Sequence, residues 1–161
     1  MPLLPDPTTV VLESSALLSY LADESGGDVV EAVLRGATLG ELTVICPALC
    51  LGETLISAVV SVGAEHIDRL RVAVERLPLE VLSCDVAEAM DIALARLTWG
   101  LDSPEAAAAA AAKQRSAVLI TANPQFSSYE RAGGWVYWIG PEAWRNEPML
   151  FDPFARFRAV E

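Results

Sequence analysis

The sequence predicts an α/β fold, a three-layer α/β/α sandwich built around a mainly parallel sheet. Short apolar, β-branched runs alternate with longer segments whose apolar residues recur every three or four positions, which is typical of strands alternating with helices. The chain has 161 residues, of which 53% are hydrophobic, enough for one sizeable core. We therefore expect a single domain over 1–161, with a core at about 8–140 and an aromatic C-terminal extension at 141–161.

The first half of the chain reads as two strand–helix units with an extra helix in each. Gly and Pro residues mark the boundaries, because they end or open helices. The predicted elements are a strand at Thr8–Leu12, a helix capped by Ser14 or Ser15 and broken at Gly26-Gly27, a helix with Val30, Val33, Leu34 and Ala37 that ends at Gly40, a strand at 42–46, a helix that Pro47 opens, and a helix with Ile67, Leu70, Val74 and Leu77 that Pro78 stops.

The second half repeats the alternation and adds a capping signal. Asp85 followed by Glu88 is typical of a capping box at a helix start. The predicted elements are a strand at 79–84, a helix with the apolar face Val86, Met90, Ala93, Leu94 and Leu97 that Gly100 ends, a helix that Ser103-Pro104 opens and that contains Ala106–Ala112, a strand at 117–121, a turn at Asn123-Pro124, and a strand at 135–139.

Composition narrows the possible environments and partners. With 22 acidic and 11 basic residues, the net charge of −11 disfavours a dedicated nucleic-acid binder, although a basic patch or bound metal can invert the local field. No apolar run reaches the ~20 residues of a membrane span, and the start has no signal-peptide pattern, so we expect no membrane association. The three cysteines suggest a reducing cytoplasm, with Cys46 and Cys50 as small buried hydrophobes rather than metal ligands.

Four polar residues fall where a parallel sheet places its ligands, beyond the carboxyl ends of the strands. Glu13 follows the first strand, and Asn123 follows the strand at 117–121. Glu53 interrupts an otherwise apolar helical row of Leu49, Ile56 and Val60, and Glu105 lies in the first turn of its helix. Each has a simpler interpretation alone. Glu13 could end a strand and Glu53 could be a salt-bridged core residue, while Glu105 could complement the helix dipole and Asn123 could simply form a turn. Together they indicate a carboxylate cluster, which selects Mg²⁺ or Mn²⁺.

Three sequence stretches carry a resemblance to a known family. They are "LESSALL" at the end of the first strand, "LGETLIS" in the helix after the second strand, and "SPEAAAAAAAKQRSAVLITANPQF" from the alanine-rich helix into the next strand. In this order and spacing the chain resembles the PIN-domain family of metal-dependent ribonucleases, which includes the toxins of bacterial toxin–antitoxin pairs. The resemblance covers Thr8 to about Ile139.

The resemblance implies a set of site residues, with departures from the family pattern. Glu13, Glu53 and Glu105 would be the metal ligands, and Asn123 would join them in catalysis. Glu13 and Glu105 replace family aspartates, and Asn123 replaces the last acid, so the site has one negative charge fewer. Asn123 and Ser15 would position water or phosphate. Ser15, Asp102 and Thr121 would help to bind the cofactor, and Asp102 would partly compensate for the lost charge.

Two functions of different classes compete at this point. The first is a Mg²⁺- or Mn²⁺-dependent ribonuclease with a weakened site, in which three gathered acids raise the pKa of at least one. The second is a catalytically inactive PIN-fold module for binding or dimerisation, and a weaker third reading is a pocket for a small phosphorylated or cationic ligand. The expected partners are RNA for an active site, an antitoxin-like protein, and a second copy of the chain.

The aromatic C-terminal region allows two interpretations. It could dock a partner, or it could pack over the edge of the sheet. The residues concerned are Trp135, Tyr137, Trp138, Trp144, Phe151, Phe154 and Phe157.

Overall fold

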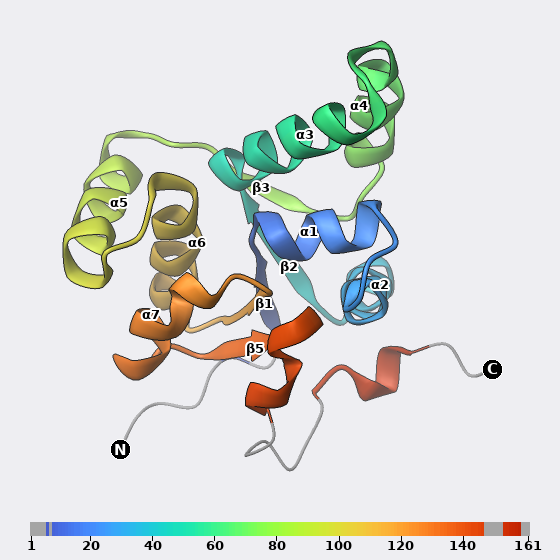
Figure 1. Ribbon diagram of the computed structural model, residues 1–161. Coiled ribbons are helices and arrows are strands. Elements are labelled where there is room, and N and C mark those ends of the chain that lie inside the picture. The colour runs from blue at the N-terminus through green and yellow to red at the C-terminus, as the bar shows by residue number, and fades with distance from the viewer. Residues whose placement is uncertain (1–5, 7, 147–152, 159–161) are drawn as a thin grey trace.

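A parallel five-stranded sheet forms the centre of the computed structural model, which describes residues 6, 8–146 and 153–158 (Figure 1). The predicted fold class is confirmed, and within these residues every strand pair is parallel. The strand order is β3-β2-β1-β4-β5, so β1 lies in the middle. The strands are β1 (Thr9–Leu12), β2 (Thr43–Pro47), β3 (Glu80–Leu82), β4 (Val118–Thr121) and β5 (Val136–Trp138).

Helices connect the strands and cover both faces of the sheet (Figure 1). The helix α2 and the C-terminal segment lie on one face, and α5, α6 and α7 lie on the other. The helices are α1 (Ser14–Leu21), α2 (Gly27–Thr38), α3 (Ala48–Val62), α4 (Ile67–Glu75), α5 (Val86–Trp99), α6 (Ser103–Gln114) and α7 (Ser127–Arg131), with 3₁₀ turns η1 (Ala64–His66), η2 (Pro124–Phe126), η3 (Gly140–Asn146) and η4 (Ala155–Phe157). None of the helices in the described ranges is both long and apolar enough to cross a membrane.

Alternate residues of the central strand feed two separate apolar clusters. Val11 belongs to the cluster beneath α6, whereas Val10 and Leu12 belong to the cluster beneath α2. This division follows from the two-residue period of a strand, which sends successive side chains to opposite faces. Because both faces are covered, Val10, Val11 and Leu12 of β1 are fully buried and read as a continuous apolar run, as the sequence predicts.

The helix α6 is buried almost all round. All seven alanines of Ala106–Ala112 are buried, against the sheet on one side and against α5 and α3 on the others. Alanine is therefore needed here for its small size as well as its helix propensity, since a larger side chain would push these layers apart.

Three expectations are wrong, one about exposure, one about strand length and one about capping. The apolar face of α5 points into solvent, and its buried side consists of Ala95 with partly buried neighbours. The strand expected at 79–84 is shorter. The N-terminal cap of α1 is Glu13, and both expected caps, Ser14 and Ser15, are the first residues inside the helix.

The C-terminal aromatic residues mainly pack against the body of the fold. Phe154 and Phe157 are buried in the cluster beneath α2, and Tyr137 and Trp138 are buried within β5. Trp135 is half-buried, and Trp144 is 63% exposed. The packing interpretation therefore holds for Phe154 and Phe157, while Phe151 lies outside the described residues.

Enlarging an alanine of α6 should destabilise the protein. We expect Ala109→Leu to lower the free energy of unfolding by about 1–3 kcal/mol, because the fully buried Ala109 leaves no room for extra methylenes. Urea denaturation measures the change. Gln114→Leu, at an exposed position of the same helix, is the control; equal losses in the two variants would contradict this account.

Candidate functional site

The candidate site lies where β1 and β4 end side by side. In the parallel register Leu12 pairs with Ile120, so Glu13 and Thr121 emerge next to each other at the carboxyl edge of the sheet. The chain turns directly into α1 after β1, and into the Asn123-Pro124 turn after β4. The topology thus brings together Glu13, Ser15, Thr121 and Asn123 from two distant parts of the sequence.

Glu13 is a buried carboxylate that caps α1. Its side chain is only 1% exposed. The Oε1 atom accepts hydrogen bonds from the backbone N–H groups of Ser15 (2.8 Å) and Ala16 (3.2 Å) and from the hydroxyls of Thr121 (2.9 Å) and Ser15. One oxygen therefore satisfies two orphan N–H groups at the helix start and also links α1 to β4.

Burial dominates the electrostatics of Glu13. Removal from water raises its pKa from 4.5 to about 6, while the hydrogen bonds from Ser15, Thr121 and Ala16 act in the opposite direction. A raised pKa in this pocket was expected, but from repulsion between neighbouring acids. The cause is instead desolvation, because buried charge is costly even when it is hydrogen-bonded.

Asn123 and Glu105 form the second half of the site. The Asn123 side-chain amide donates from Nδ2 to Glu105 Oε1 at 3.4 Å, and its Oδ1 accepts from the backbone N–H of Gln125 at 3.1 Å. The backbone N–H of Asn123 donates to Thr121 Oγ1 at 2.8 Å, which joins this pair to the Glu13 cluster. Glu105 Oε2 is buried and has no hydrogen-bond partner within the described chain.

The structure does not place Glu53 in this hydrogen-bonded group. Glu53 is exposed, and its row of Leu49, Ile56 and Val60 is also exposed, so the expected interrupted core stripe does not exist. The buried side of α3 consists of Cys50, Thr54 and Ala58. Glu53 lies three residues from Cys50, whose thiol donates to the Pro104 carbonyl beside Glu105.

Asp102 also stays outside the cluster. It is exposed at the start of α6 and makes no capping hydrogen bond with its side chain. Over the residues described, no three Asp, Glu, His or Cys side chains stand close enough to hold one ion. The expected convergence of Glu13, Glu53 and Glu105 is therefore not found.

As arranged here, these residues do not fit a divalent cation. The side-chain amide of Asn123 points its N–H₂ donor at Glu105 Oε1, whereas a cation bound there would need an oxygen acceptor. Glu13 already gives Oε1 to four protein donors, which leaves only its Oε2 as a possible ion ligand. Divalent ions such as Mg²⁺ need oxygen ligands that face the ion in near-octahedral geometry.

Sequence reasoning missed a small polar network under this site. Thr54 is fully buried and its hydroxyl donates to the Cys50 carbonyl at 2.9 Å, while Ser14 Oγ donates to the same carbonyl at 3.1 Å. The Ser14 contact, together with a 3.4 Å hydrogen bond from Thr54 Oγ1 to the Ser14 carbonyl, joins α1 to α3. The four-residue spacing of the small residues Cys50, Thr54 and Ala58 was the available signal, since it marks a close helix contact.

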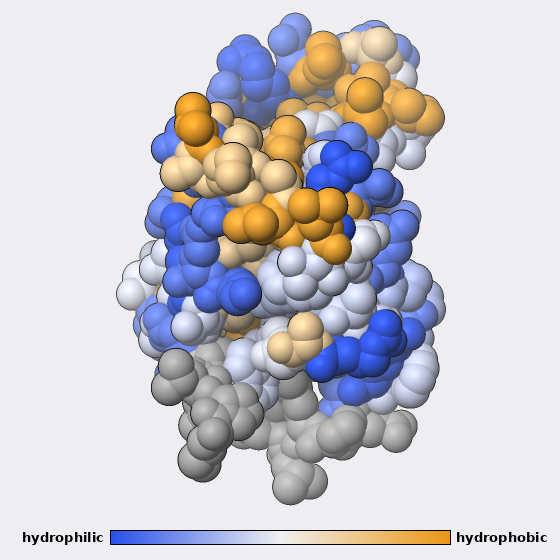
Figure 2. Space-filling view, turned by 90° about the vertical axis from the view of Figure 1, so that its left-hand side faces the viewer, coloured by the Kyte–Doolittle hydropathy of each residue, from blue (hydrophilic) through white to orange (hydrophobic). Residues whose placement is uncertain are grey.

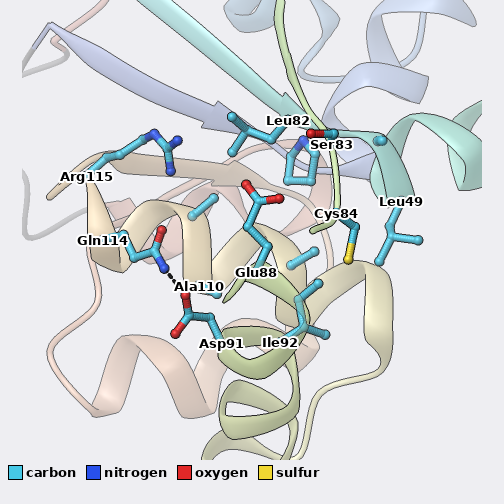
Figure 3. Close-up of a pocket in the computed structure, with 14 residues that line it drawn as sticks. Leu49, Leu82, Ser83, Cys84, Glu88, Asp91, Ile92, Ala110, Gln114 and Arg115 are labelled. Atoms are coloured by element: carbon cyan, nitrogen blue, oxygen red, sulfur yellow. Dashed lines mark hydrogen bonds between the residues drawn. The ribbon is translucent and has the colours of Figure 1, made fainter. Parts of the chain in front are cut away.

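A separate hollow lies at the edge of the sheet. It includes neither Glu13 nor Glu105, which we call the acidic pair. Figure 3 shows Leu49, Leu82 and Ile92 around it, with Cys84 at its side. The same view shows Gln114 hydrogen-bonded to Asp91. This hollow, between the start of α3 and the inner side of α5, is mainly apolar, and it is too small for more than a side chain.

Comparisons with known proteins give one family and several similar folds. A family model described as "PIN domain" matches residues 10–132. A VapBC2 structure from Rickettsia felis, bound to a DNA fragment from the promoter, is 13% identical, with a TM-score of 0.59 over 82% of this chain and 99% of the other. FitAcB from Neisseria gonorrhoeae is 18% identical, with a TM-score of 0.57 over 91% and 99%.

A third similar structure is a toxin–antitoxin complex from Klebsiella pneumoniae. It is 16% identical, with a TM-score of 0.55 over 73% of this chain and 90% of the other. None of the curated proteins matches the chain significantly. At such low identities, the similarity to solved structures shows a shared fold.

The buried Glu13 should give the metal-free protein a measurable pH dependence. Because folding favours protonated Glu13, its contribution to stability is fully present below about pH 4.5 and is lost as the pH rises to about 6. The loss amounts to roughly 2 kcal/mol. Urea denaturation in EDTA, between pH 4 and 7.5, measures it.

Glu13→Gln provides the matched control for this titration. All other acids titrate in both proteins, so the difference in unfolding free energy between wild type and variant isolates Glu13. We expect wild type to lose stability relative to the variant across this window. A difference that stays constant with pH would show that Glu13 has an ordinary pKa.

Proposed function

This chain belongs to the PIN-domain family, and from that premise we propose that it acts by binding protein partners rather than by metal-dependent cleavage. The observation that carries the proposal is the use of Glu13. Its Oε1 atom serves as the cap of α1 and as the link to Thr121, which is a structural role. With Asn123 donating to Glu105 and Glu53 outside the cluster, the pocket offers no ion-binding triad among the described side chains.

The first proposed partner is a second copy of the chain. Along the outer face of α5, four large apolar side chains are exposed: Val86 by 82%, Met90 by 59%, Leu94 by 56% and Leu97 by 84%. Figure 2 looks onto this side of the molecule and shows apolar atoms gathered across it. Such a row costs free energy in water, and a second α5 would cover it.

A second exposed apolar row lies on α3. Leu49, Ile56 and Val60 are exposed, and the apolar hollow of Figure 3 lies between Leu49 and Ile92 of α5. A single side chain from the second copy would fill that hollow. A buried anchor surrounded by further apolar contacts is the usual composition of a protein interface.

The second proposed partner is an antitoxin-like protein. The Klebsiella structure of the same fold is a toxin–antitoxin complex, and this likeness motivates the proposal for the present chain. The net charge of −11 favours a partner with a basic binding segment.

A metal-dependent ribonuclease remains the second candidate function, and one observation favours it. Glu105 Oε2 is buried without a partner among the described residues, and a cation there would remove that cost. In this reading Glu105 and Glu13 hold Mg²⁺ or Mn²⁺, Glu53 joins from the rim, and the substrate is RNA. We rank it second because the arrangement of Glu13 and Asn123 opposes it.

Metal titration separates the two candidates. We expect the melting temperature of wild type to be the same in EDTA, Mg²⁺ and Mn²⁺ up to millimolar ion, and an RNA panel to stay intact. A variant that restores the family acids, Glu13→Asp with Asn123→Asp, should gain metal-dependent stability. The gain would be about 2.7 kcal/mol when the ion exceeds its Kd a hundredfold.

Two outcomes would favour the ribonuclease instead. One is stabilisation of wild type by Mn²⁺, and the other is metal-dependent RNA cleavage. Because contaminating nucleases mimic weak activity, cleavage counts only if Glu53→Gln, prepared in the same way, abolishes it.

Charges on the outer face of α5 should dissociate the proposed dimer. We expect wild type to be dimeric by light scattering and Leu97→Glu to be monomeric, because the substitution buries an unpaired charge at the contact. Leu39→Glu, at the residue that follows α2 and is 62% exposed, should leave the dimer intact. A monomeric wild type at all concentrations would refute the dimer without bearing on the metal site.

A further inference from the structure

A second cavity lies at the opposite end of the sheet from the acidic pair. It is bounded by the ends of α5 and α6 and by α7 with the turn that follows it. Ala117 and Trp135, which line it, immediately precede β4 and β5, so it opens at the amino ends of these strands. We call it the Trp99 cavity; it encloses about 310 Å³ and is lined by Thr98, Trp99, Lys113, Ser116, Tyr129 and Trp135, together with alanines and Gly133-Gly134.

The only lysine of the sequence stands at this cavity. Lys113 Nζ lies 5.4 Å from the centre of the Trp99 ring, which is within cation–π range. It forms no ion pair with any described carboxylate, and none of the lining residues is an Asp or Glu. Lys113 is thus the one charged residue among the described residues that line this cavity, although the chain as a whole has 22 acidic and 11 basic residues.

The other polar groups around the cavity are unused hydrogen-bond donors. Tyr129 is 3% exposed as a residue, and its hydroxyl, which makes no hydrogen bond within the described chain, is not itself fully buried. The ring end that carries this hydroxyl lies against Gly134, where a Cβ would come within 2.4 Å of Tyr129 Cζ. The indole N–H of Trp99, in contrast, is fully buried and has no partner in the described chain.

The walls between these donors are flat and apolar. Trp99 and Tyr129 meet edge to face, with ring centres 4.9 Å apart, and Trp135 forms a further wall. Among the residues that line the cavity, only the Trp99 indole N–H is a buried donor without an acceptor in the described chain, whereas Lys113 is exposed, so the cavity combines one unpaired buried donor with a solvent-facing cation. Flat walls favour a planar group, and a cation with several donors favours an oxyanion.

We propose that the Trp99 cavity binds a small oxyanion carried on a planar apolar group, such as an aromatic carboxylate or an aromatic phosphate. The oxyanion accepts from Lys113 and Tyr129, and the planar group lies among the aromatic walls. Thr98 and Ser116 add hydroxyls at the rim. The site is independent of the partner surface on α5 and of the acidic pair, so neither of those proposals fails with it.

Four probes separate the parts of this proposal. Benzoate and phenyl phosphate carry both the ring and the oxyanion, benzamide carries the ring without charge, and inorganic phosphate carries the oxyanion alone. The readout is the ¹H–¹⁵N signal of the Trp99 indole, identified by its loss in Trp99→Phe. We expect saturable shifts with benzoate or phenyl phosphate, and binding at least about tenfold weaker for benzamide and phosphate.

Variants of the full chain test the assigned contacts. Lys113→Met keeps the length of the side chain but removes the charge, and we expect it to weaken binding about tenfold. Lys113→Arg keeps the charge and should retain binding, and Tyr129→Phe should weaken it. Arg131→Gln, at an exposed cation of α7 that does not line the cavity, should change nothing. Unchanged thermal melts confirm that each variant is folded.

The results that would overturn the proposal are equally definite. No saturable shift with either ring-bearing anion would remove the site. Equal binding of benzamide and benzoate would remove the anion requirement, and equal binding by Lys113→Met and wild type would remove the role of Lys113. Equal weakening by Arg131→Gln and Lys113→Met would reduce the effect to net charge.

Discussion

The hydrogen bonds around Glu13 Oε1 hold the candidate site and much of the fold together. They join the end of β1 to the first turn of α1 and to Thr121 of β4. Ser15 extends the cluster, because its hydroxyl also accepts from the backbone N–H of Ala122 at 2.9 Å. Two central strands and one helix thus meet at a single buried carboxylate. Such a network is stable only when every member is satisfied, which restricts what else Glu13 can do.

The strands and helices followed from periodicity because local residue choices agree with the burial of the sheet. The continuous apolar run of β1, the capping box of Asp85 and Glu88, and the left-handed Gly100 all act within a few residues. These signals are local, so a sequence without structure is enough to interpret them. The resemblance to the PIN family, carried by their order, is likewise confirmed.

The use of each acidic residue could not be predicted in the same way. Whether Glu13 faces an ion or caps a helix depends on the position of Thr121, which is 108 residues away. The sequence predicts the two sides of α3 in reverse, because Leu49, Ile56 and Val60 are apolar yet exposed, whereas Cys50 and Thr54 are small and buried. A row of apolar residues indicates burial, but it does not distinguish the core from an uncovered contact surface.

The alanine helix α6 links the two ends of the sheet and restricts how this protein can change over time. Glu105 lies in its first turn and Lys113 in its last, so each end complements the helix dipole. Between them, seven positions already hold almost the smallest side chain, so mutation offers mainly enlargement or glycine, and both are unfavourable. Selection should therefore conserve the span between the two pockets. The positions at the two ends of α6, and those on the solvent side of α5, are where substitutions can change ligands and partners without disturbing the core.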